Sequence, residues 1–143
     1  MRRGDVVWLD LDPARGSEQT GKRPGVVMTR EAINRFSPVV VVVPLTTYRG
    51  RRLYPSDVLV EAPEGGLAQD SVAMALQIRV ADRERLGQPL RRLESETIHK
   101  IEHAILQVLD IDMHWKVVPG DFEIMVGKSS AEIPLQGVLK VTP

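Results

Sequence analysis

Arg23 and Thr46 are the residues whose types and positions best suit chemistry on a phosphate ester. Arg23 stands between a glycine-containing loop and a hydrophobic segment, and its guanidinium presents a planar fork of donors that fits phosphate oxygens. Such a fork stabilises the charge that builds on these oxygens when a hydroxyl attacks the phosphorus. Thr46 follows a valine-rich segment, and its hydroxyl could donate to the same phosphate. Taken alone, both residues are equally typical of an ordinary protein surface.

The proton transfers of such a reaction are less well explained. No histidine lies in these segments, and arginine, with a pKa above about 12, is a poor general base. Thr47 also offers a second hydroxyl beside Thr46, so residue type alone does not choose between them.

A basic segment with interleaved aromatics lies between Tyr48 and Tyr54 and contains Arg49, Arg51 and Arg52. Arginines can follow a phosphate backbone while tyrosines stack on unpaired bases. The formal net charge of the chain is +0, so nucleic-acid binding would have to depend on a local patch of this kind. A solvated loop is the alternative interpretation.

The segment His99-Lys100-Ile101-Glu102-His103 matches the ligand order of inverted zinc peptidases. The two histidines would lie one turn apart on a helix. The pattern is short and the surrounding chain is β-rich, so a solvated helix face is favoured and no metal site is predicted.

The composition is that of an ordinary globular chain. It has 143 residues, 43% hydrophobic and 27% charged, enough for one domain with a core. Cysteine is absent, which excludes disulfides and thiolate metal sites. Neither a long apolar span nor an apolar leader segment is visible, so a cytoplasmic protein without a membrane anchor is expected.

Turn residues divide the chain into short β-rich segments, which favours a small barrel. The run 39–43 is five consecutive valines between prolines, and it predicts a strand buried on both faces. From Glu94 to Leu109 the apolar residues recur at helical spacing, which predicts an amphipathic helix that Ser95 could cap. The fold class is therefore α+β, mainly β. Strands are expected at 6–11, 26–28, 39–43, 58–61, 71–76 and 77–80, with a helical turn at 31–35.

Six separated landmarks in the first two thirds of the chain resemble, in their order, the MazF/PemK family of bacterial toxin endoribonucleases. The resemblance covers about residues 3–110. It implies an SH3-like barrel with a C-terminal amphipathic helix, and it favours Thr46 over Thr47. The landmarks are residues 3–13, 16–19, 22–27, 43–46, 70–72 and 77–79.

The resemblance also implies an activity and partners. Members of the family are homodimers that cleave single-stranded RNA by 2′-hydroxyl transesterification, without a metal or other cofactor. A toxin of this kind inhibits translation and growth. A cognate MazE-like antitoxin neutralises it, and DNA is contacted only through that antitoxin. The Tyr48 to Tyr54 loop could contact the antitoxin as well as RNA.

By the same resemblance, Arg23 and Thr46 are the catalytic residues, and Arg23 also has an acid/base role. The loop from Gly16 to Gln19 borders the RNA groove, and Gln77 and Arg79 contact bases or backbone. The alternatives are an ordinary polar turn and a capped strand end. The expected RNA-binding residues are Ser17, Glu18, Gln19, Arg49, Arg51, Arg52, Gln77 and Arg79.

Residues 112–143 do not fit the family pattern. Two strands are expected between Trp115 and Gly127, around a Pro119–Gly120 turn, and a third from Ile133 to Val141. The segment resembles the last strands of the fibronectin-type-III-like domain that closes family 3 β-glucosidases, but it is too short to form that domain. We therefore expect an endoribonuclease domain at 1–110 and an appended β-hairpin-like tail at 111–143, not an independent domain.

Two other functions fit a barrel of this type. One is a CcdB-like toxin that binds DNA gyrase and cleaves no RNA. The other is an inactive remnant, because of the unusual tail. The presence of both Arg23 and Thr46 favours the nuclease.

Overall fold

The computed structural model describes residues 1–111, 120–126 and 135–141. The chain forms two compact units, Met1–Asp112 and Met113–Pro143. The division lies two residues beyond the boundary expected at residue 110. No helix within the described ranges is long and apolar enough to cross a membrane.

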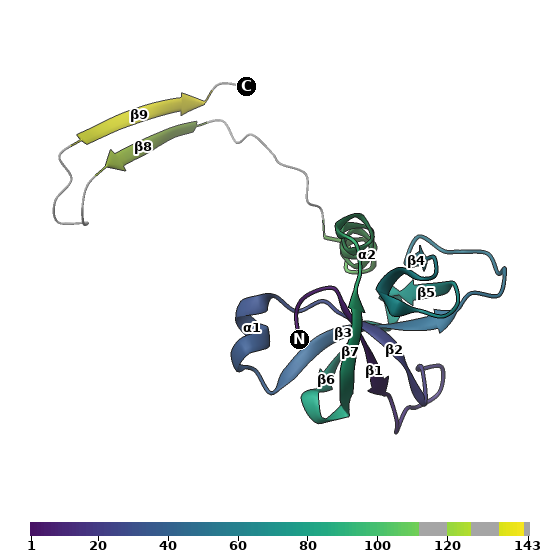
Figure 1. Ribbon diagram of the computed structural model, residues 1–143. Coiled ribbons are helices and arrows are strands. Elements are labelled where there is room, and N and C mark those ends of the chain that lie inside the picture. The colour runs from purple at the N-terminus through teal and green to yellow at the C-terminus, as the bar shows by residue number, and fades with distance from the viewer. Residues whose placement is uncertain (112–119, 127–134, 142–143) are drawn as a thin grey trace. The chain divides into compact units, whose positions relative to one another are not determined.

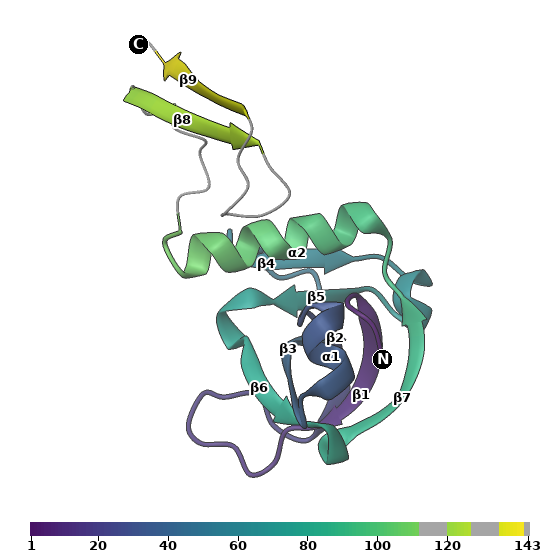
Figure 2. The same ribbon diagram turned by 90° about the vertical axis from the view of Figure 1, so that its left-hand side faces the viewer.

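The first unit is a strongly curved antiparallel sheet with two α-helices (Figures 1 and 2). The strands pair in the order β4-β5-β3-β2-β1-β7, and β6 also pairs with β3. This arrangement confirms the mainly β fold class with a C-terminal helix. The elements are β1 (Asp5–Asp10), β2 (Lys22–Val27), α1 (Glu31–Phe36), β3 (Val39–Thr47), β4 (Asp57–Val60), η1 (Glu64–Gly66), β5 (Ser71–Met74), η2 (Ala75–Gln77), β6 (Arg79–Asp82), η3 (Arg83–Arg85), β7 (Leu86–Arg92) and α2 (Ser95–Val108).

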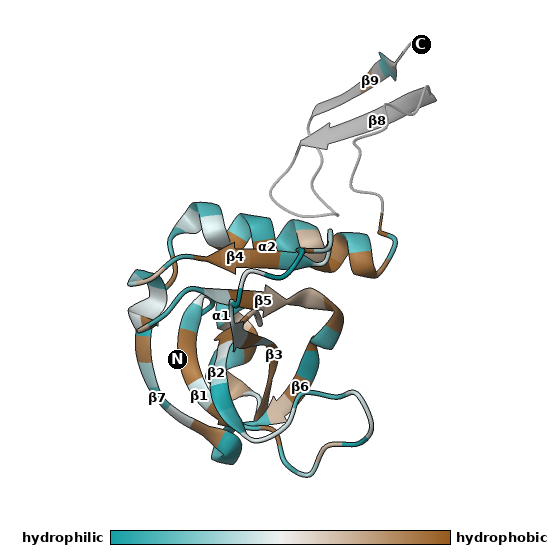
Figure 3. Cartoon of the chain, turned by 90° about the vertical axis from the view of Figure 1, so that its right-hand side faces the viewer, coloured by the Kyte–Doolittle hydropathy of each residue, from teal (hydrophilic) through white to brown (hydrophobic). Residues whose placement is uncertain are grey.

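Strand β3 is the centre of this sheet. It pairs with β2 through Val43 and Pro44, with β5 through Leu45 to Thr47, and with β6 through Val39 to Val42. Val40, Val42 and Val43 are buried, as the valine run predicts, but Val39 is 38% exposed and Val41 is only partly buried, so the prediction of burial on both faces is wrong at these two positions. Figure 3 shows the hydrophobic residues along β3 and the largely hydrophilic loop between β1 and β2.

The sheet has hydrophobic side chains on both faces. Val6 packs in one core cluster with Ile98 and Ile101 of α2, whereas the adjacent Val7 packs in a second cluster with Leu9. Successive residues of a strand point to opposite faces, so the two clusters lie on the two sides of β1. Burial on both faces fixes the register of the inner strands.

Helix α2 packs its apolar face against β4 and η2. Ile98, Ile101 and Ala104 are buried, as the helical spacing predicts. The prediction that Ser95 caps the helix is wrong, because Ser95 is already the first helical residue and Glu94 occupies the cap position.

A carboxylate from another element takes over the capping. Glu64 of η1 accepts hydrogen bonds from the backbone N–H of Glu94 at 2.8 Å and from the hydroxyl of Thr97 at 3.0 Å. A negative charge at a helix N-terminus is also favourable to the helix dipole. The sequence pattern does not show this contact because thirty residues separate the partners.

Glu64→Ala should therefore lower the free energy of unfolding by about 1 kcal/mol, the usual effect of losing a helix cap. Urea unfolding followed by circular dichroism measures this change. Glu61→Ala is the matched control, because Glu61 is an exposed carboxylate nearby whose side chain makes no hydrogen bond within the described residues. Equal stability of the two variants would contradict a capping role for Glu64.

In the second unit, β8 (Gly120–Val126) pairs antiparallel with β9 (Leu135–Val141). The pair confirms a β-hairpin-like arrangement, and β9 lies within the strand expected at 133–141. Gly120 does not form the expected turn, because it begins β8 and pairs with Val141. The strand expected before Pro119 lies outside the described residues.

Candidate active site

The ends of β2 and β3 bring Arg23 and Thr46 together. The two strands are antiparallel, with Gly25 opposite Pro44. The same register, extended by two residues, places Arg23 opposite Thr46 with both side chains on one face. Both residues line one cleft of about 550 Å³, which we call the active cleft.

Gly25 allows the close packing behind this cleft. A Cβ atom at this position would lie 2.2 Å from Cδ2 of Leu9 and 3.2 Å from the carbonyl oxygen of Val43. Any larger residue would therefore require the buried Leu9 side chain or β2 itself to shift. Glycine keeps β2 tight against the core two residues from Arg23.

The loop between β1 and β2 holds the Arg23 side chain. Its Nε donates to the carbonyl oxygen of Thr20 at 2.9 Å, and its Nη1 donates to the Gln19 side-chain oxygen. The Gln19 backbone N–H donates to Oε1 of Gln77 at 3.3 Å, and Nε2 of Gln77 donates to the carbonyl oxygen of Ser17 at 3.3 Å. Nη2 of Arg23 makes no hydrogen bond to any residue that the structure describes, so this edge of the guanidinium can face a substrate.

Gln77 thus anchors the loop to η2. We predicted from the resemblance that it contacts RNA, and the structure adds a contact between both ends of its amide and the loop. Glu18 is exposed and accepts a bond from the Arg15 backbone N–H at 3.2 Å, outside the Arg23 network. Arg79 pairs with Val42 in the sheet and lines neither the active cleft nor its neighbour.

A larger cleft adjoins the active cleft, and Thr46 and Arg51 line both. It has a volume of about 840 Å³, and the surface exposed along it is mainly apolar. Tyr54 is 63% exposed and Leu76 is 68% exposed along it. Thr46 therefore stands where a polar cleft meets an apolar one.

The three arginines of the loop between β3 and β4 are not equivalent. Arg51 forms an ion pair with Asp57 at 2.7 Å, so its charge is largely satisfied within the protein. Arg49 is exposed and lines the active cleft beside Arg23. Arg52 is exposed but lines neither cleft. Of these three side chains, Arg49 is the best placed to meet a phosphate.

The ion pair also determines the charge state of its members. Burial alone would raise the pKa of Asp57, but hydrogen bonds from Arg51 and from the Tyr54 backbone N–H outweigh that effect and lower it below 3.8. The hydrogen bond that Arg51 donates to the same carboxylate raises the pKa of Arg51. Asp57 therefore binds its proton less readily in the folded chain than in the unfolded chain.

This pKa difference predicts a change in acid stability. A lowered folded-state pKa contributes stability above pH 3.8 that is lost as the pH falls through the folded value. Asp57→Asn removes the charge, so we expect it to cost on the order of 0.5 kcal/mol at neutral pH and less in acid. Urea unfolding of both proteins across this pH range measures the difference. A gap that stays constant with pH would contradict the prediction.

The two histidines of α2, His99 and His103, are exposed to solvent. No group of three potential metal ligands was found among the residues that the structure describes. His99 is 71% exposed, and Glu102, which would lie between the histidines in the motif, pairs with Arg3. This agrees with the prediction of a solvated helix face.

Several residues that line the active cleft were not predicted from the sequence, and Trp8 and Lys22 are the two with side chains suited to RNA. Trp8 and Lys22 line it together with Arg23, and Trp8 is 49% exposed although its neighbours Val7 and Leu9 are buried. A lone tryptophan in an apolar strand looks like a core residue. Only its register opposite Pro24, at the exposed end of β2, reveals its position.

The sequence profile of a family described as a PemK-like, MazF-like toxin of type II toxin-antitoxin systems matches residues 2–109. Among curated proteins, the chain is 37% identical over 105 residues to endoribonuclease EndoA of Bacillus subtilis strain 168. The match covers 73% of this chain and 90% of EndoA.

Two solved structures are also similar to this chain. The chain is similar to MazF from Deinococcus radiodurans with a TM-score of 0.67 and 26% identity, covering 77% of this chain and 96% of MazF. It is also similar to an endoribonuclease from a mycobacterial species, solved in complex with its cognate antitoxin, with a TM-score of 0.65 and 28% identity. That match covers 81% of this chain and 99% of the other. The family and enzyme class predicted from the landmark residues are confirmed.

Proposed function

Since the chain belongs to the PemK-like, MazF-like family of toxins of type II toxin-antitoxin systems, we propose that it is an endoribonuclease that cleaves single-stranded mRNA in the cytoplasm. The observation that supports this most strongly is the meeting of Arg23 and Thr46 in one cleft. Lys22 and Arg49 line the same cleft and supply positive charge for the RNA backbone.

In the proposed reaction, the 2′-hydroxyl oxygen attacks the adjacent phosphorus while the bond from phosphorus to the 5′-oxygen breaks. The products are a 2′,3′-cyclic phosphate and a 5′-hydroxyl end. Nη2 of Arg23 donates to the phosphate oxygens as their charge grows, and the Thr46 hydroxyl donates to the same group. The 2′-hydroxyl loses its proton and the leaving 5′-oxygen gains one, and we assign this transfer to Arg23 by resemblance.

The hydrogen bonds around Arg23 give the loop a positioning role. Gln19 and the Thr20 carbonyl together hold one side of the guanidinium, and Gln77 holds Gln19. A guanidinium fixed before the substrate arrives loses less conformational freedom in the transition state. Ser17, Glu18 and Gln19 then contact the RNA from the loop, and Arg79 contacts it from β6.

The antitoxin and the second subunit are also part of the proposal. The mycobacterial relative was solved with its cognate antitoxin, and we propose a MazE-like antitoxin for this chain. The apolar cleft beside Thr46, with exposed Tyr54 and Leu76, suits a protein partner that would cover the catalytic pair. We propose a homodimer as the active form. A CcdB-like gyrase poison is not favoured, because it would leave the Arg23–Thr46 pair unused.

Cleavage of a linear RNA should yield discrete fragments in the presence of EDTA. The same sequence held in a hairpin stem should be cut far more slowly, because base stacking and edge readout require unpaired bases. Cleavage at low substrate concentration should also fall as salt rises, because phosphate contacts release counterions. Gel analysis of end-labelled RNA measures all three. Equal cutting of stem and linear RNA, or loss of cutting in chelator, would contradict the proposal.

A further inference from the structure

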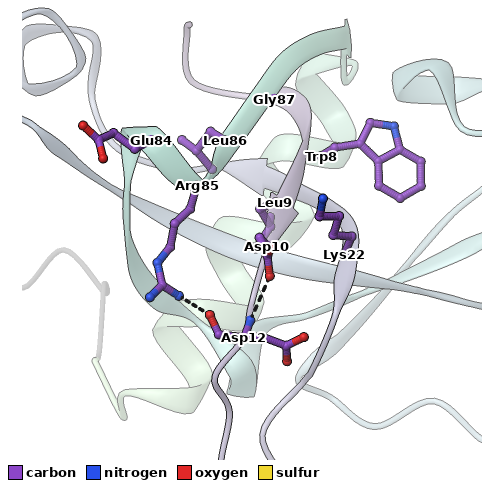
Figure 4. A pocket seen from close by; sticks show the side chains of 9 residues that line it. All are labelled: Trp8, Leu9, Asp10, Asp12, Lys22, Glu84, Arg85, Leu86 and Gly87. Carbon is purple, nitrogen blue, oxygen red and sulfur yellow. Dashed lines mark hydrogen bonds between the residues drawn. The ribbon is translucent and has the colours of Figure 1, made fainter.

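A second cleft, in which five of the lining residues are charged, adjoins the active cleft at Trp8. It has a volume of about 540 Å³, and we call it the flanking cleft. Trp8 and Lys22 line both clefts, so the two clefts adjoin at these side chains. Figure 4 shows Trp8 and Lys22 at one side of the flanking cleft and Arg85 reaching towards Asp12 at the other.

The polar floor of the flanking cleft is held in place by the backbone. Oδ1 of Asp10 accepts from the Asp12 N–H at 3.1 Å, and Oδ1 of Asp12 accepts from the Gly21 N–H at 3.0 Å. Arg85 donates to the carbonyl oxygen of Asp12 at 2.8 Å. The second oxygen of each carboxylate has no hydrogen-bond partner among the described residues, so the cleft offers two fixed acceptors.

An aromatic surface stands beside these acceptors. Trp8 is 49% exposed, and on the neighbouring strand Gly87 has no side chain to cover it. A Cβ atom at Gly87 would lie 3.4 Å from Cβ of Trp8, an ordinary contact, and the backbone there is not left-handed. The cleft is therefore open because of the glycine and not because the strand is strained.

The charges of the cleft do not suit a phosphate. Asp10, Asp12 and Glu84 outnumber Lys22 and Arg85. Carboxylate oxygens accept hydrogen bonds from the amino groups of bases, such as N4 of cytosine or N6 of adenine. Uracil presents carbonyl oxygens at the corresponding position, which a carboxylate repels. An indole beside such acceptors can stack on the face of the same base.

We propose that the flanking cleft binds one unpaired base next to the cleaved phosphate and selects bases with an exocyclic amino group over uracil. This inference rests on the proposed RNA substrate. In it, Trp8 stacks on the base, and the free oxygens of Asp10 and Asp12 accept from its amino group. Lys22 lies at the border of the two clefts, where it meets the phosphate that joins them.

Two variants alter the flanking cleft without touching Arg23 or Thr46. Gly87→Leu fills the space beside Trp8 at a position that tolerates a side chain. Asp12→Asn keeps an oxygen for the Gly21 N–H but turns the free acceptor into a donor. Gln88→Leu is the matched control, because it adds the same side chain at the next exposed residue of β7, which does not line the cleft.

The test uses 2′-O-methyl RNA homopolymers of adenine, cytosine and uracil, each about ten nucleotides long, which covers a typical single-strand site. The blocked 2′-hydroxyl prevents cleavage, so fluorescence anisotropy reports binding alone. The parent and Gln88→Leu should bind the adenine and cytosine strands about tenfold more tightly than the uracil strand. Gly87→Leu should abolish this preference, and Asp12→Asn should abolish or reverse it.

The inference is overturned if the parent shows no preference, or if both cleft variants keep it. Thermal unfolding of each variant identifies any that misfold. Because Gly87→Leu and Asp12→Asn are at separate positions, the variant that folds still tests the inference if the other does not. Cleavage of unmodified RNA by the parent is measured in parallel. Absence of cleavage with base preference intact would refute the proposed function alone, whereas cleavage without base preference would refute the inference alone.

Discussion

Arg23→Ala is expected to lower the rate of RNA cleavage by about 10²–10³-fold, the usual effect of removing one preformed donor that stabilises transition-state charge. Arg23 is the residue of the active cleft whose guanidinium is already oriented, by Gln19 and Thr20, with one edge left for a phosphate. Single-turnover kinetics on a labelled linear RNA measure the chemical step. Thr46→Ala should weaken cleavage strongly as well, because a second donor to the phosphate is lost.

Two further variants distinguish the effect of losing the planar guanidinium at position 23 from the effect of losing a positive charge. Arg23→Lys keeps the positive charge but loses the planar fork, so most of the rate should still be lost. Arg35→Ala removes an exposed arginine on α1 that lines none of the three clefts, and this variant should cleave at the parental rate. Circular dichroism should show the parental fold for all of them. Parental cleavage by Arg23→Ala would remove Arg23 from the mechanism.

Ile101→Ala is expected to lower the free energy of unfolding by about 2–5 kcal/mol, because it leaves a cavity where the side chain was fully buried. Ile101 lies at 0% exposure in the cluster that joins α2 to the sheet. Small domains have a total of about 5–15 kcal/mol, so this loss is large. Urea unfolding followed by far-ultraviolet circular dichroism measures it.

Leu109→Ala provides the comparison, at the C-terminal end of the same helix. Leu109 is 55% exposed, so its truncation should change stability by no more than about 0.5 kcal/mol. A small effect at Ile101 would mean that α2 contributes little to the core. The packing assigned to its buried face would then be wrong.

The inner strands and α2 could be predicted because burial leaves a pattern in the sequence. The valines of β3 and the isoleucines of α2 show it directly. Strand β7 was missed for the opposite reason. Only Leu86 among its residues is even half-buried, and it includes Pro89, so no alternation marks it as a strand. Its backbone pairing with β1 carries no side-chain signal.

The candidate site was predictable in part. Arg23 and Thr46 were found through family landmarks, and their positions in one cleft fit that assignment. The bonds from Gln77 to the loop join residues about sixty positions apart, which no local pattern reveals. The pairing of charged side chains is hidden from a local pattern in the same way. A cluster of arginines in the sequence does not show that Arg51 is already paired with Asp57.

Strand β3 pairs with three other strands, and Thr46 lies within its pairing to β5. Thr46 therefore stands on a strand that is paired on several sides, and Arg23 lies on the adjoining strand β2, whereas the β1–β2 and β3–β4 loops carry most of the side chains expected to meet the RNA. Such a division makes the toxin easy to retarget in evolution. Mutations in the loops can change which messages are cut while the cutting chemistry is inherited intact.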